Sequence, residues 1–414
     1  MKRALGFCAG GIVALMLAVC GYWYWINISP QITIPTPVMP QPNGYDYFIR
    51  AGAAFVPDEN GVDETTDVHF VEGKSYPIAA KEAWLKQNAK ALQLLREGLK
   101  YPVCQPPVYS FTTDYFEYRK FRSLTRAFIV QSHARAERGN WSGAVQSALD
   151  GYHFGNEVVR GGPFVGGLVG IALKAIGLHE LNTLLPHTDV TTAKLTAFRL
   201  EQMYHQRWPL EKTLQDEKWQ NISGTLEIMQ SASWRTNQFR NMNIPLVARL
   251  TWLTISKRKL INDWEASSNV LIANAKLPYI QQQPIPAFSN PMVNALLPVF
   301  KRSRWNWARC DTLTLETMTM YALHAYKLNN GKYPASLKVL LPSYLKSVPV
   351  DPYDGIEPLH YKLQGNQYLL WSIGPDGIDN HGTPIINRDK RESMRYRLLD
   401  PDSKGDVVAG INVP

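Results

Sequence analysis

The residues best able to do chemistry lie in two neighbouring segments near the C-terminus, 351–361 and 371–384. Both are rich in Asp, Asn and Gly, which favour tight turns, and their carboxylate oxygens could hold an ion. Elsewhere the chain shows no Gly-x-Ser-x-Gly, no His-Glu-x-x-His, no phosphate-binding loop and no Cys-x-x-Cys. The sequence therefore identifies no reaction, and its information concerns location and architecture.

The elements that would position these segments are a helix and a hairpin. Apolar residues at helical spacing predict a helix over 309–330, and Gly331 is suited to end it in the left-handed conformation. The pattern further on predicts strands over 359–363 and 367–373, joined across Gln364-Gly365-Asn366. The C-terminal part is thus expected to be a small α/β module.

Three motifs of this module, taken in order, resemble the C-terminal part of the major pseudopilins of type II secretion. They are Ala325-Tyr-Lys-Leu-Asn-Asn-Gly-Lys-Tyr-Pro334, the segment from Leu345 to Tyr353 with its Pro-x-Asp-Pro-aromatic ending, and Trp371-Ser-Ile-Gly-Pro-Asp-Gly377. The resemblance covers about a quarter of the chain. It implies a small α/β unit with a calcium site in its final loop.

The resemblance places calcium ligands at Asp376 and Asp379, with Asp406 contributed by the last strand, and Asn380 could add an amide oxygen. Calcium binds several carboxylate and carbonyl oxygens, so the residue types suit it. The same Asp-Gly and Asp-Asn pairs are also ordinary turn residues that cap a hairpin. Both interpretations are open.

The N-terminus departs from the pseudopilin pattern. In that family a peptidase-processed Gly, followed by an aromatic residue, Thr, Leu and Glu, leads into the hydrophobic helix, and nothing like it precedes Ala4. The module also lies some three hundred residues from the N-terminal apolar segment. The resemblance therefore concerns the module and does not imply incorporation into a pilus.

The N-terminal segment predicts a membrane anchor. Residues 4–26 form an apolar run without a charge, long enough to cross a bilayer as a helix, and the aromatic residues 22–25 crowd its far end. Lys2 and Arg3 lie on the near side, so the positive-inside rule keeps the N-terminus cytoplasmic and exports the rest. This predicts a single-pass protein of a bacterial inner membrane with its body on the periplasmic side.

Two alternatives compete with a retained anchor. A cleaved signal peptide needs small residues at its cleavage site, and the bulky run 22–25 argues against one. Leu17-Ala-Val-Cys20 is similar to a bacterial lipoprotein signal, which would lipidate Cys20, although Val19 is unfavourable directly before that cysteine. In the exported part, Cys104 and Cys310 could form a disulfide or remain buried thiols.

A linker and a helical body follow the anchor. Residues 29–43 carry five prolines, which exclude a helix and favour an extended spacer that holds the body off the membrane. Apolar spacing then predicts further helices. Their expected ranges are 44–55, 78–99, 121–160 and 191–206.

Two stretches of the body have more specific patterns. Gly139-Asn-Trp141, with Ala144 and Ala148, resembles the turn and second helix of a tetratricopeptide repeat, in a single copy. The apolar, glycine-rich residues 161–177 predict a buried helix rather than a second span, because Lys174 interrupts their charge-free core.

Two pairs of His and Glu could join in a metal site between helices. Glu201 with His205, and His153 with Glu157, each have the spacing of one helix face. The alternative is that they are surface pairs at helical spacing.

Basic residues are concentrated between Ser231 and Cys310, where eleven Lys and Arg face two acidic residues. This local net charge of +9 equals that of the whole chain, and the cations alternate with large aromatic residues. Such a composition suits anionic lipid headgroups or another polyanion, or it is a solvated face over buried Trp. An exported domain makes nucleic acid a poor candidate. The cations expected at this surface are Arg249, Lys257, Arg258, Lys259, Lys301, Arg302 and Arg304.

We therefore expect a mainly α-helical protein with four parts. They are the cytoplasmic tip and transmembrane anchor (1–28), the linker (29–43), a bundle-like or solenoid-like body (44–304), and a pseudopilin-like module with an antiparallel sheet (305–414). The first hypothesis is a non-catalytic envelope protein that binds or assembles with an unidentified partner, with calcium as its cofactor. The alternative is a hydrolase or other enzyme with its site between body and module, near Glu201 and His205.

Overall fold

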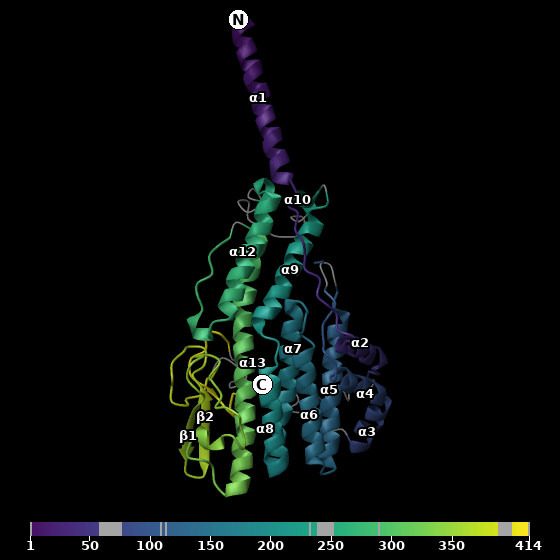
Figure 1. Ribbon diagram of the computed structural model, residues 1–414, viewed down its shortest axis with the longest axis vertical. Helices are drawn as coiled ribbons and strands as arrows, with labels where there is room; N and C mark the ends of the chain where they lie inside the picture. Colours follow the sequence, from purple (N-terminus) through teal and green to yellow (C-terminus); the bar gives the residue numbers. More distant parts are fainter. Residues whose placement is uncertain are drawn as a thin grey trace.

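The computed structural model describes residues 2–57, 77–107, 110–111, 114–231, 233–237, 252–288, 290–387 and 400–412. As the sequence predicted, the protein is mainly helical with one small antiparallel sheet (Figure 1). Its elements are, in chain order, α1 (Lys2–Asn27), α2 (Gly44–Ala54), α3 (Ile78–Gln87), α4 (Ala89–Gly98), α5 (Phe116–Glu137), α6 (Trp141–Glu157), α7 (Phe164–Leu184), η3 (Leu185–His187), α8 (Val190–His205), α9 (Leu210–Ile228), α10 (Trp234–Asn237), α12 (Lys257–Ala275), η4 (Tyr279–Gln281), α13 (Pro291–Asn330), η5 (Leu337–Leu340), β1 (His360–Gln364), β2 (Gln367–Ser372) and β3 (Val407–Val408).

Helix α1 projects away from the rest of the molecule, from the end of the body where α10 and α12 lie (Figure 1). Its described apolar side chains are exposed over most of their surface, as at Met16 (62%) and Leu17 (68%). Only its last turn is covered, where Ile26 is 1% exposed. Among the described side chains of the helix, those at its C-terminal end are the ones that join the body.

The predicted spacer is a strap that lies along the body. Between α1 and α2 the chain runs beside α9 and down to α2 (Figure 1). Ile32 packs against the apolar cluster at the α10–α12 end, and the Asn43 amide donates to the Cys104 carbonyl (2.7 Å) and accepts from its N–H (3.1 Å). These contacts show that the segment lies against the body, and its predicted role in holding the body off a membrane stays a prediction.

Helices α5 and α6 form the predicted helical hairpin. Gly139 adopts φ 75° in the turn between them, and the Asn140 side chain caps α6 by accepting from the Gly143 N–H (2.9 Å). Ala144 and Ala148 are fully buried against the neighbouring helices, whereas Trp141 stacks on His187 with ring centroids 4.2 Å apart. The likeness to a tetratricopeptide repeat stays a prediction.

Helix α7 lies inside the body. A Cβ at Gly170 would fall 2.1 Å from the Val159 side chain and 2.7 Å from the Gly155 carbonyl, so α6 and α7 meet backbone to backbone. A Cβ at Gly177 would fall 2.9 Å from the backbone nitrogen of Tyr152. The predicted buried helix is confirmed as part of the helical core.

Two predicted helices have different bounds. The helix expected over 78–99 is two helices, α3 and α4, which meet at Asn88; its buried side chain donates to the Val56 carbonyl (3.0 Å) and accepts from the Val56 N–H (2.9 Å). The helix expected over 309–330 begins at Pro291 and ends at Gly331, where φ is 76°. The boundary predicted between residues 304 and 305 therefore falls within α13, and the division into body and module stays a prediction.

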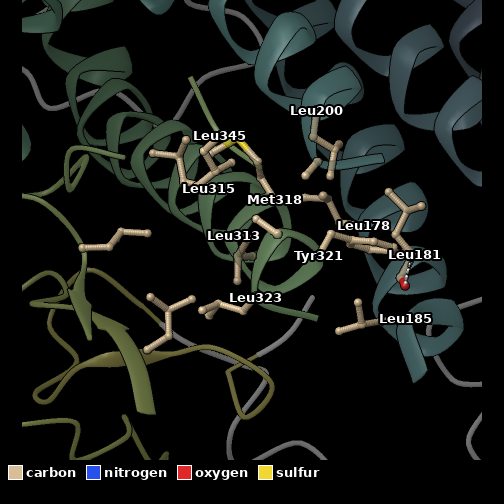
Figure 2. Packing of buried hydrophobic residues seen from close by; sticks show 14 of the residues in the cluster. Leu178, Leu181, Leu185, Leu200, Leu313, Leu315, Met318, Tyr321, Leu323 and Leu345 are labelled. Atoms are coloured by element: carbon tan, nitrogen blue, oxygen red, sulfur yellow. Dashed lines mark hydrogen bonds between the residues drawn. The ribbon is translucent and has the colours of Figure 1, made fainter. Parts of the chain in front are cut away.

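One apolar core joins the body to the C-terminal segments. Leu178 and Leu181 of α7 and Leu200 of α8 meet the side chains of α13, and Leu345 reaches the same cluster (Figure 2). The Tyr321 hydroxyl donates to the Leu181 carbonyl at 2.7 Å, which satisfies its polar atom within this core. Helix α13 is thus the common wall of the two parts.

The small sheet has the order β1-β2-β3 and is antiparallel throughout. Gln364 pairs with Gln367 across the predicted turn, in which Gly365 adopts φ 60°. Strand β3 pairs with the end of β2, Trp371 opposite Val408. This pairing brings Asp406, just before β3, beside the loop that follows β2.

Candidate functional site

Asp406 is completely buried and holds the predicted calcium loop in place through the backbone. Its carboxylate accepts the N–H groups of Asn380 (3.1 Å) and Gly382 (2.7 Å). Burial raises the pKa of Asp406; these two bonds lower it, and the nearby carboxylates of Asp379 and Asp376 raise it again. The site therefore concentrates negative charge that a cation would offset.

Asp376 lies in the same loop and also bonds to backbone amides. Its carboxylate accepts from the N–H groups of Ile378 (3.2 Å) and Gly405 (3.0 Å), and the Asn380 amide approaches it at 3.5 Å. Asp376, Asn380 and Asp406 thus lie together, as the sequence predicted. The bonds that hold them join residues 376–382 to residues 405 and 406, which are distant in the sequence.

Asp379 faces a different group of partners. Its carboxylate accepts from the Trp371 ring N–H (2.9 Å) and the His381 backbone N–H (2.9 Å), and the imidazoles of His360 and His381 lie 3.7 and 3.4 Å away. Burial raises the pKa of Asp379, but these bonds and the two histidines lower it more. This carboxylate is therefore turned to β1 and β2.

The predicted ligands Asp376, Asp379, Asn380 and Asp406 offer carboxylate and amide oxygens, which suit calcium. In the described part of the chain, however, no three His, Cys, Asp or Glu side chains converge as metal ligands would. The carboxylates instead bond to backbone N–H groups, which is the turn-capping role weighed against the ion. The calcium site stays a prediction.

Asp351 ties the preceding turn series to the sheet. The carboxylate is fully buried and accepts from the Ser372 hydroxyl (2.7 Å) and from the N–H groups of Ile373 and Tyr353 (2.9 Å each). Burial raises its pKa, although these bonds lower it. The Asp-Pro-Tyr motif that begins at Asp351 therefore has a structural role, which is to join the turn series to β2.

Glu316 of α13 is a buried acid that the sequence analysis missed. It is 2% exposed, and within the described residues its Oε1 has no hydrogen-bond partner. Burial, and then the charge of Asp351, raise its pKa well above the usual range. A periodic apolar pattern offers no signal for it, because Glu316 occupies a polar position in the part of α13, residues 312–319, that is buried on all sides.

The His and Glu pairs of the body are not assembled into a metal site. Both Glu201 oxygens accept from backbone N–H groups of Lys346 and Ser347 (3.0–3.2 Å), and His205 is exposed. Glu157 accepts two bonds from Arg160 (2.6 and 2.9 Å), whereas the nearest His153 nitrogen is 3.9 Å away. Glu201 thus fastens the C-terminal part to α8, with both of its carboxylate oxygens bonded to backbone N–H groups.

Glu180, a second carboxylate of the body, lies beside a serine and a histidine, as in a serine hydrolase. The hydrogen bonds, however, do not connect the three side chains in the order that catalysis needs. Glu180 accepts from the Ser132 hydroxyl (2.7 Å) and contacts His133 Nε2 (2.9 Å). A nucleophilic serine would need to donate to the histidine, whereas the single hydroxyl proton of Ser132 is shared between the Glu180 carboxylate (2.7 Å) and the Ala144 carbonyl (3.0 Å), and Ser132 is fully buried. These residues therefore join α5, α6 and α7.

The end of α1 is bonded to the tip of the body by Arg235 of α10 and by residues 252–254, and Lys257 of α12 binds the start of the strap at Ser29. Arg235 of α10 donates to the carbonyls of Ile26 (3.4 Å) and Trp252 (2.8 Å), and its guanidinium lies 5.5 Å from the Trp23 ring. The Tyr22 hydroxyl donates to the Thr254 carbonyl (3.1 Å). We call this set of contacts the anchor clamp.

The predicted basic surface is divided by the structure. Lys257 belongs to the anchor clamp, with bonds to Ser29 (3.2 Å) and the Met229 carbonyl (3.0 Å), and Lys259 is paired with Asp263 (2.8 Å). Arg304 is half-buried and donates to the Leu277 carbonyl. Arg258 and Arg302 are exposed, on α12 and α13, while Arg249 and the side chain of Lys301 lie outside the described residues.

By length and composition, one helix of the described side chains could cross a bilayer, residues 164–187, and 56% of its most apolar window is buried in the body. Residues 11–27 form a shorter apolar helix, and the side chains of residues 2–10 of α1 lie outside the description. Cys20, Cys104 and Cys310 are free thiols.

Comparisons with protein-family models, with curated proteins and with solved structures each found no match.

Proposed function

We propose that this chain is a single-pass membrane protein of a bacterial envelope, anchored by α1, whose exported body binds or assembles with another protein. The observation that carries the proposal is the contrast along α1. Its described apolar side chains are exposed, which is unfavourable in water over so large a surface, while its last turn is bonded to the body. A bilayer would cover the exposed part.

The anchor clamp supports a fixed orientation of the body on the membrane. Aromatic residues favour the headgroup layer, and Trp23, Trp234 and Trp252 gather where α1 meets the body. Arg258 is exposed at this end and is the described cation best placed for an anionic headgroup or another polyanion. Flotation of the chain lacking residues 2–27 with anionic and with neutral liposomes tests that contact; equal recovery contradicts it.

The membrane proposal is tested by extracting membranes that contain the full chain with alkaline carbonate. Retention in the pellet, together with protection of the body from protease added on the cytoplasmic side, is the expected result. Release into the supernatant contradicts the anchor. Crosslinking in native membranes, followed by identification of the attached protein, then tests the partner.

Calcium is a second proposal, supported by the oxygen donors of Asp376, Asn380 and Asp406, which hydrogen bonds hold in one loop, and by the charges of Asp376 and Asp379 acting on Asp406. Its ion would relieve their repulsion and join the loop after β2 to β3. Calcium should raise the melting temperature of the full chain, and Asp376→Asn should abolish the shift. Asp402→Asn, at an exposed acid nearby, is the matched control. An identical melting curve with calcium and with chelator contradicts the site.

A further inference from the structure

A cavity lies between the strap and the body, and none of the functions discussed above uses it. Its volume is about 210 Å³. We call it the strap cavity. Its walls are the strap, the loop before α7, Pro107 and one face of α9. The residues that line it include Pro35, Thr36, Gln215, Asp216, Trp219 and Gln220.

The polar wall of the strap cavity consists of the carboxylate of Asp216 and the carboxamides of Gln215 and Gln220. Asp216 Oδ2 is buried and makes no hydrogen bond within the described residues. Burial raises the pKa of Asp216 to about 6, although Lys212 and the nearby Trp208 ring nitrogen lower it. Gln220 donates one amide proton to the Tyr115 hydroxyl (2.8 Å), so its other donor and its oxygen remain available.

The apolar wall consists of proline rings and the Trp219 indole. Flat apolar surfaces facing a few polar groups are typical of sites that hold one small ligand. The Lys218 ammonium lies 5.1 Å from the centroid of the Trp219 ring. A cationic ligand would meet that charge on the same ring, which favours a neutral ligand.

The walls are held in place by bonds between separate elements. The Glu217 carboxylate, next to Asp216, accepts from the Phe164 N–H at 2.9 Å and so fixes α9 to the start of α7. Gly161 adopts φ 72°, and a Cβ there would fall 2.8 Å from the Cys104 sulfur. Asn43 fixes the far end of the strap. The cavity is therefore preformed.

We propose that the strap cavity binds a single neutral sugar residue, whose hydroxyl groups bond to Asp216, Gln215 and Gln220 while a C–H face packs on Trp219. Hydroxyl groups donate to a carboxylate and also accept from amides, so they match the side chains of Asp216, Gln215 and Gln220 that line the cavity. The volume lies below the roughly 300–1,000 Å³ of sites for drug-sized ligands, so it suits one ring. The proposal does not depend on the membrane proposal.

The test uses the full chain in phospholipid nanodiscs, because many detergents carry sugar headgroups. Glucose, galactose, mannose and N-acetylglucosamine are titrated separately, by calorimetry and by saturation-transfer NMR. At least one should bind with a Kd of about 1 mM or tighter. Asp216→Asn should weaken that binding roughly tenfold or more, whereas Glu227→Gln, an exposed acid further along α9, should leave it unchanged.

Folding is checked by melting each variant. If Trp219→Ala unfolds, Trp219→Phe, which keeps an aromatic face, replaces it and should retain most of the binding. The proposal is overturned if no sugar binds at ~10 mM, if Asp216→Asn binds as well as the unaltered chain, or if putrescine or choline binds where the sugars do not.

Discussion

Helices α1 and α7 are both apolar and glycine-containing, yet they occupy opposite environments. Nothing lies within 4 Å of a Cβ built at Gly11 or Gly21 of α1, whereas Gly170 and Gly177 of α7 are in contact with the backbone of α6. Residues 164–187 are long and apolar enough to cross a bilayer, yet 56% of their most apolar window is buried in the body. The contrast shows that an apolar helix can be assigned to the core or to a membrane only from the side chains that pack against it, and not from its composition.

The strongest test of this contrast substitutes a glycine in each helix. Gly170→Leu should destabilise the body by more than about 3 kcal/mol, because the side chain would overlap Val159 and the Gly155 carbonyl. Gly21→Leu should leave the melting temperature unchanged, since the space around it is open. Thermal unfolding followed by circular dichroism measures both. Similar melting temperatures for the two variants would break the comparison.

A charge in the exposed helix should affect location. Leu17→Arg places a cation at a position that is 68% exposed on α1 and costs about 2.5–3.5 kcal/mol at the centre of a bilayer. The variant should shift to the soluble fraction, as measured by immunoblotting of fractionated cells. Lys174→Leu, which removes the buried charge of α7, should leave the fractionation unchanged. A membrane-bound Leu17→Arg variant would contradict the assignment of α1.

A third prediction concerns the helical core, in which α13 buries the carboxyl group of Glu316. Burial raises the pKa of Glu316, so its contribution to stability is full below the usual pKa of a glutamate and is lost as the pH rises through the folded value. Glu316→Gln should raise the free energy of unfolding at pH 8 by about 1–2 kcal/mol and leave it nearly unchanged at pH 4. Urea titrations at both pH values measure this. An equal effect at both would exclude ionisation as the cause.

The smallest expected effect concerns the junction between the two environments. Arg235→Ala removes the bonds to Ile26 and Trp252 and should cost about 1–2 kcal/mol locally. Hydrogen exchange of residues 26–32 should become faster while the chain remains in the membrane. Gln230→Ala, at an exposed site of the same end, should change neither the exchange rate nor the membrane location. Unchanged exchange in Arg235→Ala would show that the anchor clamp does not order the strap.

Local patterns predicted the elements but not their mutual contacts. The helical spacing of the body, the Gly331 stop and the hairpin across Gln364–Asn366 follow from nearest-neighbour chemistry, and the structure has them. The first half of α13 was interpreted as a basic surface because its cations are visible in the sequence, whereas the burial of Trp305 and Trp307 depends on partners far along the chain.

The sites show the same limit. Turn residues at 376–382 predicted that Asp376 and Asn380 would lie together, and Asp406 joins them through the pairing of β3 with β2. The partners of Glu201, Arg235 and Glu316 are separated from them by long stretches of chain, so no spacing rule could reveal them. The strap cavity likewise exists only because residues 35–37 return to α9.

The central claim is that α1 anchors the chain and α7 does not. Alkaline carbonate extraction of membranes from cells that express either the full chain or residues 28–414 measures it directly. The account predicts that the full chain stays in the pellet and that residues 28–414, which retain α7, are recovered in the supernatant as folded protein. Retention of residues 28–414 in the pellet would contradict it.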